Sequence, residues 1–225
     1  MTQTKPIIAI DGPAGSGKST IAKLVAKKMG LFYIDTGAMY RALALKAIRA
    51  GISPHDEKEI LKVAQSAKID LSYDTLSERL TVLLDNEDVS EEIRKPYIAE
   101  SVSYIAKIKE VRDIMVASQR RLAENKRSIL EGRDISTVVF PDAYRKFFLD
   151  ASPEERIKRR YLEMKEKHMP VEESKVKTDM ERRDSIDSTR EHAPLKRSPE
   201  AIYIDTTNMT INDVVDRIIN ESKNL

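Results

Sequence analysis

The sequence predicts an α/β fold in which a parallel sheet is covered by helices on both faces. Short, mostly apolar runs of four or five residues alternate with segments that have helical spacing. These strand-like runs are residues 7–10, 31–35, 128–131, 146–150 and 201–205. Such strands are typical of parallel sheets that are buried on both faces. The stretch DGPAGSGKST at 11–20 joins the first strand to a helix and has the glycines of a phosphate-binding loop.

The composition fits a single domain and excludes several kinds of site. The chain has 225 residues, enough for a substantial core, and no cysteine, which excludes disulfides and thiolate metal sites. Its 39 Lys and Arg nearly balance 37 Asp and Glu, which argues against a dedicated nucleic-acid binder. No run approaches the roughly 20 apolar residues of a membrane span. The start, MTQTKPIIAID, is too short and polar for a signal peptide, so we expect a cytoplasmic protein with no membrane partner.

In the first half of the chain, helical spacing and helix-end residues define the expected elements. A helix is expected over 18–29, directly after the loop. Thr36 and Gly37 follow the second strand and are expected to form a turn. The segment AMYRALALKAIRAG has helical spacing and ends in a glycine, as helices often do. The next helical segment starts at Ser53, a good cap, with Pro54 at the first helical position.

The middle of the chain interrupts the alternation of strands and helices. Alternating apolar residues and the turn-rich DNED predict small antiparallel strands over 69–89. A long helical region is expected over 96–125. Near the other end, SPEERIKRRYLEMKEKH opens with a capping-box pattern from Ser152 to Glu155. An amphipathic helix over 210–222 closes the fold.

Polar residues follow the ends of four predicted strands. They are Asp11, Asp35-Thr36-Gly37, Glu131-Gly132-Arg133-Asp134 and Asp150-Ala151-Ser152. Two of these ends carry a glycine, although the whole chain has only 7. Ligands of open parallel sheets bind at the carboxyl ends of the strands. We therefore expect these residues to share one site.

The loop after the first strand matches the full phosphate-loop pattern, Gly12-x4-Gly17-Lys18-Ser19. Its glycines allow backbone N–H groups to turn toward phosphate oxygens, and the helix that follows adds a favourable dipole. Lys18 is expected to reach the β- and γ-phosphates, and Ser19 to bind Mg²⁺. The residues expected to hold the nucleoside triphosphate are Gly12, Pro13, Ala14, Gly15, Ser16, Gly17, Lys18, Ser19 and Thr20.

The loop alone leaves the reaction open. A GTPase would need Asn-Lys-x-Asp, but the nearest segment, NKRS at 125–128, has serine in the last place. The sequence also lacks an apolar strand ending in Asp-Glu, which is usual in motor ATPases, and the Leu-Ser-Gly-Gly of transport ATPases. The remaining possibilities include a P-loop kinase for a small acceptor, such as UMP, AMP or shikimate, and a nucleotide-dependent switch or nucleic-acid-associated ATPase.

Arginines are the other notable feature. Several lie near turns, strand ends or Gly and Asp residues: Arg41, Arg112, Arg133, Arg156, Arg159, Arg160, Arg183 and Arg190. Solvated helix faces would account for any one of them. Residues 152–197 hold 13 Lys and Arg against 11 Asp and Glu, so they form no nucleic-acid-binding stripe. Arginine mixed with acid suits a mobile segment that closes over phosphates and keeps water out.

Five segments together resemble the bacterial cytidylate kinases. They are GPAGSGKST, DTGAMYRA, GRDISTVVFPDA, LDASPEERIKRR and RRDSIDSTREHAPL. The phosphate loop is shared widely, whereas the second, third and last segments are much more specific. The resemblance runs from residue 7 to about 220 and implies a P-loop kinase fold with three parts. These are a core (1–38, 105–151 and 191–225), a monophosphate-binding insert with small antiparallel strands (39–104) and a helical lid (152–190).

The resemblance also implies a reaction, in which ATP and CMP or dCMP give ADP and CDP or dCDP with Mg²⁺. It places Arg156, Arg159 and Arg160 in a lid over ATP, and it makes Lys18, Arg133, Arg159 and Arg190 the catalytic cations. The acceptor nucleotide would be held by Thr36, Gly37, Tyr40, Arg41, Ser103, Arg112, Arg133, Asp134, Arg183, Asp187 and Arg190. No general base is expected, because the acceptor oxygen belongs to a phosphate that is already anionic. We expect a monomer that binds no nucleic acid.

Base recognition follows from the chemistry of cytosine. Ser103, Arg112 and Asp134 are the residues that the resemblance assigns to the base. A carboxylate at Asp134 can accept a hydrogen bond from the 4-amino group, and Arg112 can donate to the O2/N3 edge. Uracil presents an oxygen in place of that amine, so such a site discriminates against it.

Two positions depart from the family pattern. Thr36 stands where serine is common, and both residues carry a hydroxyl. Ser136 stands where glycine is expected in GRDIGTVVFP, so we expect a narrower turn beside Asp134. His55, His168 and His192 lie in polar, turn-like surroundings, and no chemistry is assigned to them.

Overall fold

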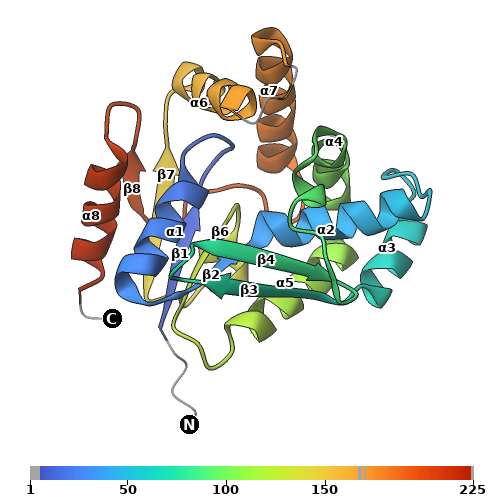
Figure 1. The fold of residues 1–225 in the computed structure, drawn as a ribbon, viewed down its shortest axis with the longest axis horizontal. Coiled ribbons are helices and arrows are strands. Elements are labelled where there is room, and N and C mark those ends of the chain that lie inside the picture. Colours follow the sequence, from blue (N-terminus) through green and yellow to red (C-terminus); the bar gives the residue numbers. More distant parts are fainter. Residues whose placement is uncertain (1–5, 167–168, 170, 224–225) are drawn as a thin grey trace.

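The strands form one parallel sheet in the order β2-β6-β1-β7-β8 (Figure 1). A computed structural model describes residues 6–166, 169 and 171–223. The strands are β1 (Ile7–Asp11), β2 (Phe32–Asp35), β6 (Ser128–Gly132), β7 (Arg145–Asp150) and β8 (Ile202–Asp205). Two parts of the sequence-based prediction lie outside the described residues. They are the two ends of the expected core, at 1–5 and 224–225, and the end of the expected helix over 152–168, which includes His168. The predicted sheet is confirmed within one or two residues at each strand.

Helices flank this sheet, as the sequence predicts. They are α1 (Lys18–Met29), α2 (Thr36–Arg49), α3 (Glu57–Ser66), α4 (Pro96–Ile105), α5 (Lys109–Ala123), α6 (Pro153–Glu166), α7 (Glu173–Thr189) and α8 (Ile211–Glu221). α1 packs against α8 and β6, whereas α2 packs against β6 and α5 against β2. The sheet residues Ile8, Ile10, Leu130 and Phe147 have no exposed surface, which places the core between these layers.

A second, antiparallel sheet lies beside the first. It joins β3 (Ile69–Asp74), β4 (Arg79–Leu84) and β5 (Glu87–Asp88), and β4 packs on α2. On β3 and β4, buried apolar residues alternate with more exposed ones, because only one face of this sheet is covered. The β interruption expected over 69–89 is therefore confirmed.

α6 and α7 pack together above the end of the main sheet where the phosphate loop lies (Figure 1). Ser152 caps α6 by accepting a hydrogen bond from the backbone N–H of Glu155 at 3.2 Å, as the sequence predicts. The reciprocal half of the capping box is replaced, because the N–H of Ser152 donates to Thr207 and the Glu155 carboxylate pairs with Arg159.

Three sequence-based boundaries are wrong. Thr36 and Gly37 form no turn but begin α2, because the Asp35 carboxylate accepts from the N–H of Ala38 at 2.7 Å and caps the helix one residue after β2. α3 begins after Asp56, which caps it through the N–H of Glu59, rather than at Ser53. The helical region expected over 96–125 is broken at 106–108 into α4 and α5.

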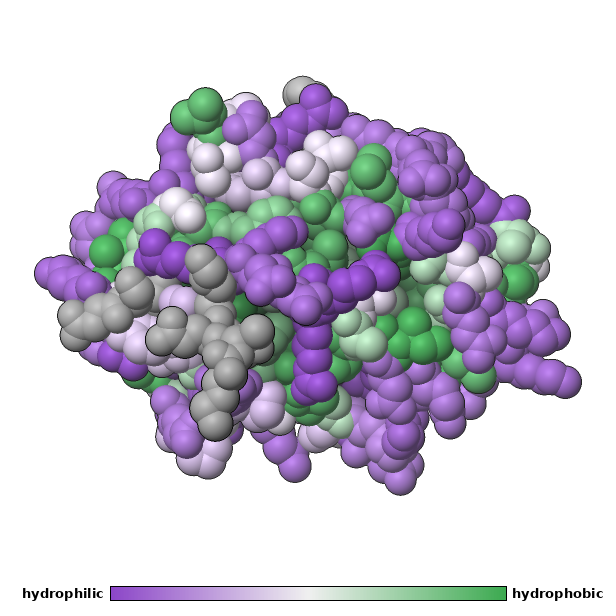
Figure 2. Space-filling view, turned by 90° about the horizontal axis from the view of Figure 1, so that it is seen from below, coloured by the Kyte–Doolittle hydropathy of each residue, from purple (hydrophilic) through white to green (hydrophobic). Residues whose placement is uncertain are grey.

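Polar and apolar residues are mixed on the surface. Figure 2 shows the end opposite α6 and α7, where hydrophilic residues cover most of the outline and hydrophobic ones show between them. Large exposed apolar side chains occur on separate elements, such as Leu76 in the β3–β4 turn and Leu162 on α6. Within the described part of the chain, no helix is long and apolar enough to cross a membrane.

The corrected start of α3 gives a test of the fold. Asp56→Ala removes a cap and should lower the free energy of unfolding by about 1 kcal/mol, measured by urea denaturation. Ser53→Ala is the matched control and should change it by less than about 0.5 kcal/mol, because Ser53 only accepts a hydrogen bond from the N–H of His55. A larger loss from Ser53→Ala than from Asp56→Ala would contradict this helix boundary.

Candidate active site

The phosphate loop runs from the end of β1 into α1 beside the end of β7. A Cβ on Gly12 would lie 2.0 Å from the carbonyl oxygen of Leu149 on β7, so only glycine fits there. Gly17 has a φ of 87° and directly precedes α1. The first turn of α1 contains no acidic residue, and no side chain caps it. The loop therefore presents backbone N–H groups at a helix N-terminus without a side-chain cap, which is a site for an anion.

Lys18 is the buried cation of this loop. Its Nζ donates to the carbonyl of Pro13 at 2.6 Å and to the hydroxyl of Ser16 at 3.2 Å. Burial, and next the charge of Arg133, lower the pKa of Lys18 to about 7. A cation with two neutral partners, crowded by another cation, is well placed to bind the phosphates of a nucleotide.

Two carboxylates lie at the ends of neighbouring strands beside Lys18. Glu131 is opposite Asp35 in the β2–β6 pair, and it accepts hydrogen bonds from Tyr33 at 2.6 Å and from Ser19. Burial, and next the charge of Asp35, raise the pKa of Glu131. Asp35 pairs with Arg41 at 2.9 Å. Glu131 was noted in the sequence only as a strand-end residue, and nothing there indicated its bond to the loop serine.

The exposed hydroxyl of Ser19, beside the Glu131 carboxylate, fits a hard divalent cation. Mg²⁺ prefers oxygen ligands and usually keeps several waters, relying on one or two protein groups and on the phosphates of its substrate. Among the described residues, no group of three or more His, Asp or Glu side chains forms a metal cage. Ser19 is thus the residue that would hold the ion.

An arginine–aspartate cluster lies at the end of β6 and under α7. It comprises Arg112, Arg133, Asp134, Arg183, Asp187 and Arg190. The break between α4 and α5 supports one member, because the free carbonyl of Ala106 accepts a hydrogen bond from Arg112 at 2.9 Å. A second nitrogen of Arg112 pairs with Asp134, so a buried guanidinium and a buried carboxylate meet where the cytosine edge is expected.

Several polar atoms around Asp134 are buried without a hydrogen-bond partner. They are the Tyr40 hydroxyl, Nε of Arg112 and one terminal nitrogen of Arg190, which lies 3.9 Å from the Asp134 carboxylate. The Arg112 guanidinium lies 5.7 Å from the centre of the Tyr40 ring, and burial raises the pKa of Tyr40 to about 12. Unpaired buried donors are costly and mark a place where a polar ligand can bind.

Asp187 on α7 gathers the cations of the cluster. Its carboxylate lies 2.9 Å from Arg133, 3.8 Å from Arg183 and 3.7 Å from Arg190. Burial opposes its charge, but these guanidiniums, Arg133 first, keep the pKa of Asp187 below its usual range. Burial and then Arg133 lower the pKa of Arg183 to about 10, and Arg41 and Arg160 add to this crowding. The cluster therefore has more cations than it can neutralise and attracts an anion.

The three lid arginines take different places. Arg156 donates to the carbonyl of Ala14 in the phosphate loop at 2.9 Å. Arg159 holds Thr206 after β8 through two bonds, at 2.9 and 2.7 Å, and lies next to Gly17. Arg160 pairs with Glu163 at 2.8 Å and is close enough to Arg183 to lower its pKa. Arg156 and Arg159 thus lie beside the phosphate loop, and Arg160 lies near the cluster.

Ser136 is fixed by a buried carboxylate at the end of β1. Its hydroxyl and its N–H both donate to Asp11, and the N–H of Ile135 donates to the same carboxylate at 2.7 Å. Burial raises the pKa of Asp11. These bonds hold the segment Ile135–Val139, a π-helical turn directly after Asp134. The serine at this position therefore adds a bond that glycine could not make.

The remaining expected residues have mixed surroundings. Thr36 is buried and donates to the carbonyl of Glu131 at 2.7 Å, a bond that joins α2 to β6. A Cβ on Gly132 would lie 2.7 Å from this hydroxyl, so the strand end needs glycine. Gly37 lies beside Asp35 and Arg41. Ser103 is buried on α4, and it takes part in none of the ion pairs that define the cluster in the described residues.

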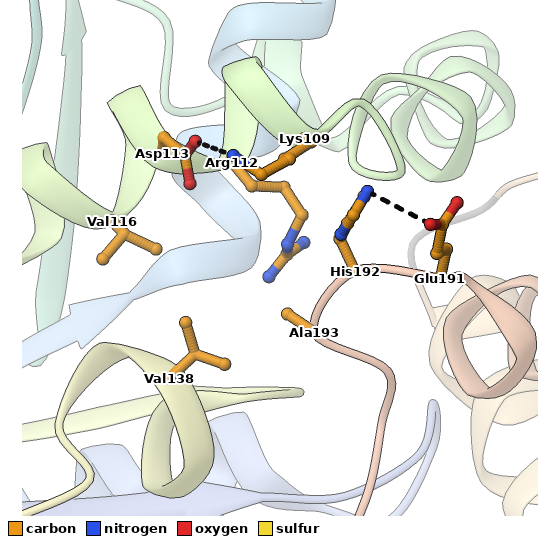
Figure 3. A pocket seen from close by; sticks show the side chains of 8 residues that line it. All are labelled: Lys109, Arg112, Asp113, Val116, Val138, Glu191, His192 and Ala193. Atoms are coloured by element: carbon orange, nitrogen blue, oxygen red, sulfur yellow. Dashed lines mark hydrogen bonds and ion pairs between the residues drawn. The ribbon is translucent and has the colours of Figure 1, made fainter.

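A cavity of about 240 Å³ adjoins the cluster on the outer side of Arg112. Figure 3 shows the guanidinium of Arg112 pointing toward Val138 and Ala193. Lys109 pairs with Asp113 above it, and His192 lies beside Glu191. The loop of His192 and Ala193 is held by Arg190, whose Nε donates to the Ala193 carbonyl at 2.7 Å. Arg112 therefore separates this cavity from Asp134.

Several known proteins are similar to this chain. A solved structure of shikimate kinase from Acinetobacter baumannii matches with a TM-score of 0.47 at 14% identity, covering 99% of this chain and 97% of that one. The fold assignment rests on the strand order above and needs no support from this likeness. Cytidylate kinase of Caldanaerobacter subterraneus subsp. tengcongensis is 54% identical over 94% of this chain and 92% of its own length.

Other relatives give the same result. Cytidylate kinase of Clostridioides difficile is 48% identical over 96% of this chain and 97% of its own length. The family model described as cytidylate kinase matches residues 8–224. The resemblance stated from the sequence is thereby confirmed over nearly the whole chain, and the chain belongs to the cytidylate kinase family.

Proposed function

We propose that this protein transfers the γ-phosphoryl group of ATP to CMP and dCMP, giving ADP and CDP or dCDP. The observation that carries this proposal is the buried Asp134 carboxylate after β6, near donors of Tyr40, Arg112 and Arg190 that have no hydrogen-bond partner. A carboxylate there accepts from the cytosine amine, and the donors pair with its O2/N3 edge. The family membership supports the same acceptor.

The two phosphate groups meet between Lys18 and the arginine–aspartate cluster. The loop and Lys18 hold the ATP phosphates, and Arg41, Arg133 and Arg183 hold the acceptor phosphate. An oxygen of that phosphate forms a bond to the γ-phosphorus while the bond to the β-phosphate oxygen breaks, and ADP leaves. Mg²⁺ at Ser19 would neutralise phosphate charge during this transfer. Arg133, Arg159 and Arg190 act with Lys18 as the catalytic cations, because each lies beside the loop or the acceptor.

The division of the chain follows from these roles. Residues 152–190 act as the lid, 39–104 as the monophosphate-binding insert and the rest as the core. α6 and α7 support the lid assignment, because they bring Arg156 to the phosphate loop and Arg183 to the cluster. Thr36, Gly37 and Ser103 stay predicted acceptor contacts. The cytoplasmic location, the monomeric state and the absence of nucleic-acid binding also stay predictions from the sequence.

An acceptor panel tests the proposal directly. ADP release should be fast with CMP and dCMP and slow with UMP, AMP and shikimate, measured by a coupled assay against the rate of ATP hydrolysis alone. Lys18→Ala should reduce transfer at least about 100-fold, because it removes a cation that stabilises the transferring group. Turnover with another acceptor and none with CMP or dCMP would refute the proposal, as would ATP hydrolysis that requires RNA or DNA.

Base selection is tested at Asp134. Asp134→Asn keeps the size of the side chain, but its amide can donate to the O4 of uracil. The ratio of kcat/KM for CMP to that for UMP should fall at least about tenfold. Asp142→Asn, in the segment that follows the π-helical turn, is the control and should leave the ratio unchanged. An unaltered ratio in Asp134→Asn would show that the base is read elsewhere.

Arg183 separates the two halves of the site. Arg183→Ala should raise KM for CMP about tenfold and change KM for ATP less than about twofold, because the guanidinium lies among Arg41, Arg133 and Asp187. Arg182→Ala is the matched control, since Arg182 is the next residue on α7 and pairs with Asp179 at the surface. An effect of Arg183→Ala on ATP alone would place this arginine with the lid residues instead.

A further inference from the structure

α7 presents a second functional face that the proposed reaction does not use. Arg183, Asp187 and Arg190 point to the arginine–aspartate cluster, whereas Met180 and Asp184, four residues apart, face the phosphate loop. A Cβ on Gly15 would lie 3.0 Å from the terminal methyl of Met180. The helix that carries residues for the acceptor therefore also touches the loop for ATP.

Asp184 makes the polar part of this contact. One carboxylate oxygen accepts a hydrogen bond from the N–H of Ala14 at 3.2 Å, and the other pairs with Arg156. Arg156 in turn donates to the carbonyl of Ala14 at 2.9 Å. The peptide groups on both sides of Ala14 are thus held by an ion pair between α6 and α7. The Asp184 side chain is only 19% exposed and that of Arg156 only 12%, so solvent screens the pair weakly.

Charge explains why a carboxylate is tolerated beside a loop that binds phosphate. Arg156 neutralises Asp184 directly, and Asp184 is also one of the charges that favour the protonated form of Lys18. The contact forms only when α7 lies over the loop, because Ala14 and Asp184 are 170 residues apart in the chain. Arg183 and Asp187, which would hold the acceptor, lie on the same helix as Asp184, so the position of α7 sets both contacts together.

We propose that Asp184 is a positioning residue that couples acceptor binding to ATP binding, by fixing Ala14 and Arg156 when α7 is in place. This inference rests on the proposed function, since it needs an acceptor held by α7. It predicts that each nucleotide strengthens the binding of the other. A purely structural carboxylate would lower stability without altering this mutual effect.

Calorimetry with AMP-PNP, in the presence and absence of saturating CMP, measures the coupling as a ratio of two Kd values. In the wild-type protein CMP should tighten AMP-PNP binding at least about fivefold. In Asp184→Ala the ratio should fall below about twofold, whereas Asp179→Ala, an exposed acid on the same helix, should keep the wild-type ratio. A wild-type ratio in Asp184→Ala, or a wild-type protein without coupling, would overturn the inference.

A second variant keeps the test decisive where Asp184→Ala does not fold. Asp184→Asn preserves the side-chain size and an oxygen for the Ala14 N–H but loses the charge that pairs with Arg156. The ratio of the two Kd values for AMP-PNP should also fall below about twofold in this variant, with a thermal midpoint near that of the wild type. Retention of the wild-type ratio would overturn the inference. Failure of the proposed function is distinct, since it appears as absence of CMP turnover in the wild-type protein. The coupling is then measured with the acceptor that the panel identifies.

Discussion

The site depends on one electrostatic constraint, which is that many guanidiniums must stay close together in a poorly solvated cleft before any phosphate arrives. Isolated buried charges are very costly, so each arginine needs a carboxylate nearby. Asp35 pairs with Arg41, Asp134 with Arg112 and Asp184 with Arg156, whereas three arginines share Asp187. Phosphate oxygens can later share these guanidiniums, because an arginine offers five donors.

These four acids come from two strand ends and from one helix. Asp35 ends β2 and caps α2 in one residue, so its position is fixed by the sheet and by the helix together. Asp134 follows β6, and its turn is held by the buried Asp11 at the end of the neighbouring β1. Asp187 comes from α7, outside the sheet. Asp35 and Asp134 thus lie at the ends of strands of the main sheet, whereas Asp184 and Asp187 lie on α7.

The sequence predicted the parts of the molecule that depend on local pattern. The five parallel strands, the phosphate loop and the antiparallel insert follow from apolar runs, glycines and alternation, and the structure confirms them. Two of the three wrong boundaries arose because a side chain other than the expected one caps the helix. Asp56 displaced Ser53 as a cap, and Asp35 capped α2 so early that the expected turn at Thr36 does not exist.

The contacts missed from the sequence are long-range. Ser136 was noticed only as a departure from glycine, because its partner Asp11 lies 125 residues away. Asp184 carried no signal in the pattern, and Glu131 was marked only as a strand-end residue, since their contacts with the loop exist only after folding. The hydrogen bond from the Thr36 hydroxyl to the Glu131 carbonyl was also missed, because it joins residues 95 positions apart.

The way the acids are used also explains how transfer proceeds without a general base. Near the loop, Glu131 accepts from Tyr33 and Ser19, Asp35 is paired with Arg41, and Asp184 with Arg156. Burial opposes the charge of Asp35, but Arg41 keeps the pKa of Asp35 below its usual range, so this carboxylate is a poor proton acceptor. A hydroxyl acceptor would need such a base, whereas the phosphate of a nucleoside monophosphate is already anionic. The pairing of these acids therefore agrees with the proposed phosphate acceptor, which needs no base.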